Sequence, residues 1–93
     1  MNLTKVQLDK VTELAHLTIF PRLIAVAMEV DEIEFIDEIN TPGTPARNAY
    51  FTGVLNQMVE TRAAVIKSAQ NGSNPAQSEL LKFIEKQLYL INK

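Results

Sequence analysis

Apolar residues recur every three to four positions along most of the chain, which is the spacing of amphipathic helices. The first such segment is "LTKVQLDKVTELAHL", and its apolar face consists of Leu8, Val11, Leu14 and Ala15. Thr4 and Gln7 have the spacing of a capping box, in which each side chain satisfies an unpaired backbone amide. We therefore predict a first helix over residues 4–17.

Two shorter helices follow in the pattern. Pro21 lacks an amide hydrogen and suits a first helical turn, so a second helix is predicted at about 20–29. Asp31 and Glu34 mark the start of a third, because Asp31 can cap it and both acids favour the positive end of the helix dipole. The break "NTPGTP" ends it. The residues expected to face inward are Ile33, Phe35, Ile36 and Ile39.

A long helical pattern occupies the second half of the chain. It begins at Thr44 and Pro45, runs to about Gln70, and is interrupted by "NGSNP", where Gly72 suits a left-handed cap. The next apolar stripe consists of Ala76, Leu80, Phe83, Ile84, Leu88 and Ile91. Because so short a connection forces an antiparallel pair, we predict a helical hairpin over residues 44–93.

The predicted fold class is all-α, with a three-helix unit over residues 1–41 that resembles a helix-turn-helix, followed by the hairpin. The stretch "IAVAMEVDEIEFIDEI", residues 24–39, carries the helix-turn-helix spacing, and the small Ala25 allows a close helix crossing. Turns of this kind commonly have Gly where this chain has Glu29. Glu29 therefore either adopts the left-handed conformation, at about 1 kcal/mol, or the turn is built differently. The alternative to a helix-turn-helix is three short helices packed without any DNA role. The alternative to a separate hairpin is that it packs on these helices as one five-helix domain.

Charge changes this picture. The net charge is −2, yet residues 29–40 hold six acids and no base, while the segments on either side are mildly basic. An acidic helix in the major groove would meet phosphates on both sides, so a single copy should bind DNA poorly. The candidate DNA contacts are Lys5, Lys10, Arg22 and Arg47. The acids assigned instead to a basic protein partner are Asp31, Glu32, Glu34, Asp37 and Glu38.

Candidate catalytic chemistry is sparse. The chain has no Cys and a single His, His16, which lies late in the first helix among apolar residues. The acids lack the glycine-centred loop of a calcium site, and no glycine-rich phosphate loop is present. We expect a non-enzymatic protein without cofactor or metal. A folded-protein composition, 46% hydrophobic and 22% charged, with no apolar run of about 20 residues, predicts a cytoplasmic protein that does not enter a membrane.

The segment "RAAVIKSAQNGSNPAQSELLKFIEK", placed after a helix-turn-helix and a Pro/Gly break, resembles phage and prophage DNA-packaging proteins, the terminase small subunits. The resemblance covers about Val11 to Lys86. It implies a ring formed through the hairpin, residues 45–91, and viral DNA recognised by the N-terminal domain with residues 31–39 as recognition helix. It also implies transfer of that DNA to a large ATPase-nuclease subunit. The acidic recognition helix departs from what DNA binding predicts.

The hairpin also predicts self-association on physical grounds, because two helices alone bury only one face each. The candidate oligomerisation residues are Phe51, Leu55, Met58, Phe83 and Leu88. Burying about 400 Å² more at ~25 cal/mol per Å² would contribute about 10 kcal/mol before association entropy is subtracted. The alternative function is a helical adaptor or regulator that does not bind nucleic acid. The opening "LTKVQLDKVTELAHLTI" resembles the first helix of the small C subunit of the transamidosome amidotransferase, over that helix alone.

Overall fold

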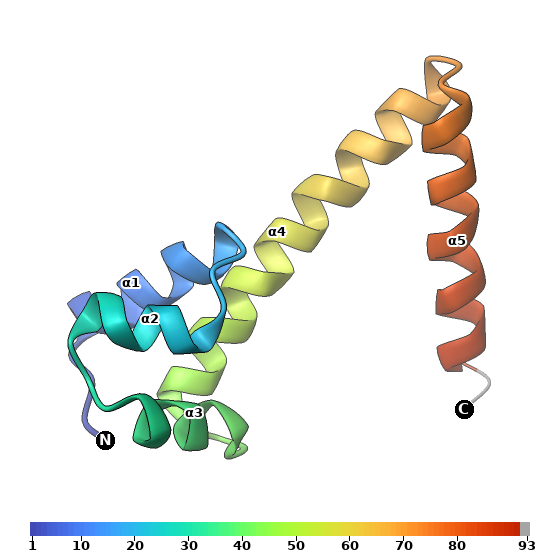
Figure 1. The fold of residues 1–93 in the computed structure, drawn as a ribbon. Coiled ribbons are helices and arrows are strands. Elements are labelled where there is room, and N and C mark those ends of the chain that lie inside the picture. Colours follow the sequence, from blue (N-terminus) through green and yellow to red (C-terminus); the bar gives the residue numbers. More distant parts are fainter. Residues whose placement is uncertain (92–93) are drawn as a thin grey trace. The chain divides into compact units, whose positions relative to one another are not determined.

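The computed structural model describes the backbone of residues 1–91, and the regular secondary structure of this part of the chain is all helix, as the sequence predicted. The five helices are α1 (Lys5–His16), α2 (Pro21–Met28), α3 (Glu32–Asn40), α4 (Pro45–Gln70) and α5 (Asn74–Ile91) (Figure 1). The predicted hairpin region extended over Asn92 and Lys93, which lie outside the described residues, as does the side chain of Ile91. The chain divides into two compact units, Met1–Met58 (unit 1) and Val59–Lys93 (unit 2).

The helix starts follow the capping signals in the sequence. The Thr4 hydroxyl accepts a hydrogen bond from the Gln7 amide at 3.1 Å, and the Gln7 side chain accepts one from the Thr4 amide at 2.8 Å. The predicted capping box is therefore confirmed. Asp31 caps α3 in the same way, with its carboxylate accepting from the Glu34 amide at 2.8 Å. These side chains satisfy amides that a helix cannot pair internally.

Unit 1 encloses a core to which all four of its helical segments contribute. Phe35, Ile24 and Val11 are its largest fully buried side chains, and the remaining buried members are Ala15, Ala25, Ile39 and Ala46. The first turns of α4 belong to this core. Gly53 permits the contact with α1, since a Cβ there would lie 2.6 Å from the Ala15 Cβ and would also collide with the Thr12 carbonyl oxygen.

This packing places the boundary between the units inside α4, between Met58 and Val59. The sequence predicted a boundary at the Pro/Gly break, between residues 41 and 44. The physical reason for the difference is that Ala46 is buried and that the Thr12 hydroxyl donates to the Ala49 carbonyl at 3.0 Å, so α4 starts as part of unit 1. The break changes the direction of the chain without ending the core.

Unit 2 contains the rest of α4 and all of α5. The Gly72 backbone has φ +92°, and Ser73 caps α5 by accepting from the Ala76 amide at 3.3 Å. The contacts between the two helices include a hydrogen bond and a cation–π contact. The Gln77 side chain donates to the Ala69 carbonyl at 3.1 Å, and the Arg62 guanidinium lies 4.6 Å from the centre of the Phe83 ring. Ala69, at 8% exposure, is the one buried residue among those described in unit 2.

Candidate nucleic-acid or partner interface

The turn between α2 and α3 has a left-handed first residue. Glu29 has φ 57° and ψ 40°, so the conformation that glycine usually supplies is adopted here by a glutamate. The Val30 amide donates to the Ala25 carbonyl at 3.1 Å, which closes the end of α2, and Val30 packs on the core. Ala25, in the middle of α2, is fully buried. An eight-residue helix, a three-residue turn and a nine-residue helix are typical of a helix-turn-helix.

Helix α3 buries one face and exposes a face that is mostly acidic. Phe35 is fully buried and Ile39 is 5% exposed, whereas Ile33 is 82% exposed. The prediction that Ile33 faces inward is therefore wrong. The residues Phe35 and Ile39 are four apart and fill the space beneath α3, so Ile33, two positions before Phe35, falls on the opposite side of the helix. The exposed face of α3 thus carries an isoleucine among carboxylates.

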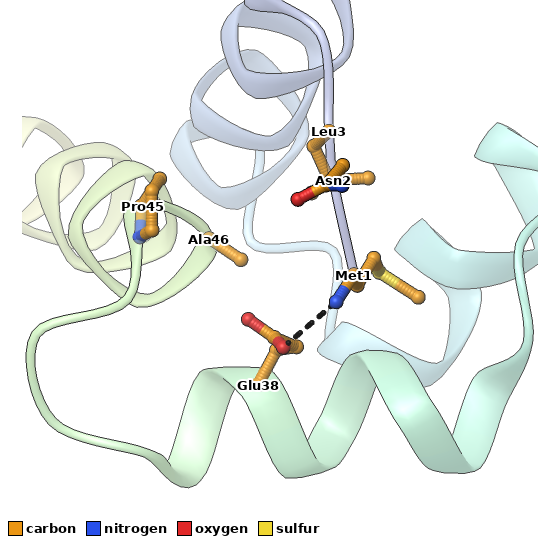
Figure 2. A pocket seen from close by; sticks show the side chains of 6 residues that line it. All are labelled: Met1, Asn2, Leu3, Glu38, Pro45 and Ala46. Atoms are coloured by element: carbon orange, nitrogen blue, oxygen red, sulfur yellow. Dashed lines mark hydrogen bonds and ion pairs between the residues drawn. The ribbon is translucent and has the colours of Figure 1, made fainter.

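Two positive groups partly offset these carboxylates. The Arg22 guanidinium, on α2, lies 2.7 Å from a Glu32 carboxylate oxygen near the start of α3. The Met1 ammonium lies 3.2 Å from a Glu38 carboxylate oxygen, beside Pro45 and Ala46 (Figure 2), and 3.8 Å from one of Glu34. Because the Arg22 and Glu32 side chains are 68% and 38% exposed, water screens that pair and it contributes little to stability.

The four candidate DNA contacts do not form one surface. Arg47 donates to the Ile39 carbonyl at 2.8 Å and lies 4.7 Å from the centre of the Phe51 ring, so its charge is used at the C-terminal end of α3. Arg22 is paired with Glu32. Lys5 and Lys10 are exposed on α1, but five positions separate them by about 140° around the helix. Only the two lysines are therefore unengaged.

The candidate oligomerisation residues differ in their surroundings. Four are exposed to between 43% and 58%, namely Phe51, Leu55, Met58 and Leu88. Phe83 is half-buried beneath Arg62 within unit 2, so much of its surface is already covered by its own chain. Phe51 also contacts Tyr50 edge-on, with ring centres 5.4 Å apart. The apolar surface open to a partner therefore includes four of the five predicted positions.

An apolar hollow of about 290 Å³ in unit 1 was not foreseen from the sequence. It lies between the end of α1, the link to α2, and α4, and its apolar lining includes Ile19, Phe20, Tyr50, Val54 and Met58. Thr18 on its lining has φ 66°, an uncommon conformation for a β-branched residue. The one sequence signal near it is Gly53, since a glycine inside a helix usually marks a close approach of another backbone.

The described residues offer no group of three or more His, Cys, Asp or Glu side chains placed to hold a metal ion. Among the helices of the same part of the chain, none has the length and apolar character required to span a bilayer.

The fold and this surface define an all-α protein with an acidic, partly apolar helix exposed on its N-terminal unit. Comparison with protein-family models, with curated proteins and with solved structures finds no match to this chain.

Proposed function

We propose that this chain is a non-enzymatic, cytoplasmic DNA-recognition protein of the terminase small-subunit type that acts as an oligomer in phage-related DNA packaging. One observation carries the proposal. The turn between α2 and α3 has the left-handed residue, the buried small residue and the helix lengths of a DNA-binding helix-turn-helix. Glu29 adopts a left-handed conformation that lowers the stability of the fold. Strain of this kind supports the proposal that the geometry of the turn has a function.

The charge distribution determines how such a protein would bind DNA. Unit 1 holds eight acids and four bases, a side-chain charge of −4, so one copy gains little from phosphate neutralisation. Lys5 and Lys10 are the groups left to contact the backbone. Several copies on one DNA molecule would add their weak contacts, because linked binding events raise the effective concentration of each subsequent one. The oligomer is therefore the DNA-binding species in this proposal, and a large terminase subunit is the partner that the resemblance implies.

Selection from a random duplex library by the full chain tests this function. We expect the selection to enrich one sequence. Its affinity, measured by fluorescence anisotropy at about 150 mM salt, should exceed that of mixed-sequence DNA by a factor of about 10³, which is the lower end of the ratios found for specific DNA-binding proteins. Sub-micromolar binding of mixed-sequence duplex by a single copy, or failure to bind any duplex even at about 50 mM salt, would overturn it.

A pair of matched variants identifies the phosphate contacts. The double variant Lys5→Ala/Lys10→Ala should reduce the slope of log affinity against log salt by about 2 for each copy that is bound, since each phosphate contact contributes about 0.9. Lys5→Arg/Lys10→Arg keeps both positive charges on α1 and serves as the control, with the slope of the wild type. Equal slopes for both doubles would assign the contacts elsewhere.

The second candidate function is a helical adaptor that does not bind nucleic acid, and Ile33 favours it. At 82% exposure among carboxylates, Ile33 suits a partner with an apolar pocket and a basic rim. For this function, Ile33→Ser should abolish binding to the basic protein partner, and neither the wild type nor the variant should bind duplex DNA. If DNA recognition is the function, the same substitution acts on the helix that enters the groove and alters the enriched sequence.

A further inference from the structure

Each unit has an apolar feature that the other residues of the same unit do not cover. The first is the hollow of unit 1, about 290 Å³, which is at the lower limit for a small-molecule site and has room for the side chains of a docking helix. Phe20 and Met58 on its lining are 53% and 43% exposed, so its opening faces outward. Its lining contains no charged residue.

The second feature is the outer face of α5, formed by Leu81, Ile84 and Leu88. These residues are spaced by three and four positions, as in the seam of paired helices, and are 59%, 44% and 55% exposed. Beyond Gln77 at the turn, the contact of α5 with α4 given by Phe83 beneath Arg62 lies on another face of the helix. Helix α5 therefore has a second apolar face that the described part of unit 2 does not cover.

The net charge of each unit favours one arrangement in which two copies cover the hollow and the outer face of α5. Unit 1 carries a side-chain charge of −4, and unit 2, with five bases and three acids, carries +2. Contact between two copies of the same unit brings like charges together. Contact between unit 1 of one copy and unit 2 of another brings opposite charges together, and complementary charge favours that pairing.

We propose that the outer face of α5 from one copy of this chain docks in the hollow of unit 1 of a second copy. This inference rests on the oligomer in the proposed function and specifies its contact. The occupant of the hollow is an apolar helix face on a unit of opposite charge. The contact is heterologous, so each docked pair leaves one hollow and one α5 face available, and assembly continues until a ring closes or an open chain grows.

Complementation between two variants tests this arrangement. Met58→Glu places a charge in the hollow and leaves α5 intact, while Leu88→Glu places one on the α5 face and leaves the hollow intact. Each variant alone should remain near the 10.4 kDa of one chain by size exclusion with light scattering, while the wild type assembles. An equimolar mixture should form a species of twice that mass and stop there, because its remaining hollow and α5 face are both blocked.

Matched controls exclude effects of the added charge. Leu23→Glu adds a charge at a residue that is about as exposed as Met58 but lies outside the hollow. Gln87→Glu adds a charge next to Leu88 in the chain, but not on the outer face of α5. Both variants should assemble like the wild type. Circular dichroism should show the same helix content for all variants. Raising salt from about 50 to 500 mM should weaken wild-type assembly several-fold, because the two units that come together carry opposite net charge.

Four results would overturn the inference. These are a monomeric wild type at high concentration, Met58→Glu that assembles normally, an inert mixture, and assembly strengthened by salt. Normal assembly of Met58→Glu would exclude the hollow as the contact and would leave the proposed oligomer standing. Because no DNA is present, loss of DNA recognition in the selection experiment would leave this result unaffected.

Discussion

Phe35 in unit 1 and Phe83 in unit 2 both belong to predicted apolar stripes, but their surroundings differ. Phe35 is fully buried with Ile24 and Val11, whereas Phe83 is half-buried beneath the Arg62 guanidinium. Seven buried residues make the core of unit 1, and only Ala69 is buried among the described residues of unit 2. The same helical periodicity therefore produces a closed core in one unit and partly exposed stripes in the other. The difference lies in the number of helices available to cover each stripe.

The largest effect expected from this difference is on stability. Phe35→Ala should lower the free energy of unfolding by about 3–5 kcal/mol, because it leaves a cavity in a closed core. Phe83→Ala should cost about 1 kcal/mol, mainly through loss of the cation–π contact with Arg62. Urea unfolding followed by circular dichroism measures both. Equal losses for the two variants would contradict the comparison.

Close packing of α4 against α1 gives the next effect. Gly53→Ala should lower the free energy of unfolding by about 2 kcal/mol through overpacking, although alanine favours a helix by about 1 kcal/mol. The control is Ala64→Gly at an exposed position of α4 in unit 2, which should cost about 1 kcal/mol through propensity alone. If Gly53→Ala raised the melting temperature, the close approach of α1 would be refuted.

A smaller effect, of opposite sign, is expected at the turn of unit 1. Glu29→Gly should raise the free energy of unfolding by about 1 kcal/mol, because glycine adopts the left-handed conformation without strain. Glu29→Ala removes the same carboxylate and keeps the strain, so it should give no such gain. Thermal unfolding distinguishes them, and a gain shared by both would point to charge rather than backbone conformation.

The smallest effect is expected from the surface pair of unit 1. Arg22→Ala should change the free energy of unfolding by less than about 0.5 kcal/mol, because both partners are substantially exposed. The difference should vanish at about 1 M salt, where screening removes the attraction. A loss of 2 kcal/mol or more, insensitive to salt, would mean that the pair is part of the folded core.

Local signals made the helices predictable. The Thr4 and Asp31 caps set the starts of two helices, and the prolines set two others, because each depends on residues a few positions apart. The sequence did not determine the backbone conformation of Glu29. The energetic cost of the left-handed conformation opposes the gain from packing Ala25 and Val30 in the core, which this turn allows. Local pattern alone does not give the balance between these two energies.

The site was less predictable because it depends on contacts between distant positions. Arg47 counted as a free cation in the sequence, but its partner is a carbonyl eight positions earlier, at the end of another helix. Ile33 fitted an inward-facing pattern as well as Phe35 did, and the packing of α3 selected Phe35. The hollow in unit 1 combines α1, the link after it and α4, which no single stretch of sequence contains.

The exposed Ile33 also bears on how the purified protein behaves in solution. The negative charges of the neighbouring carboxylates repel other copies of the protein, and this repulsion opposes non-specific association through the exposed Ile33 side chain. The isoelectric point is about 5.3, and colloidal repulsion disappears as a buffer approaches that pH. We therefore expect turbidity near pH 5 in concentrated samples, and a serine in place of Ile33 should raise the concentration at which the solution clouds.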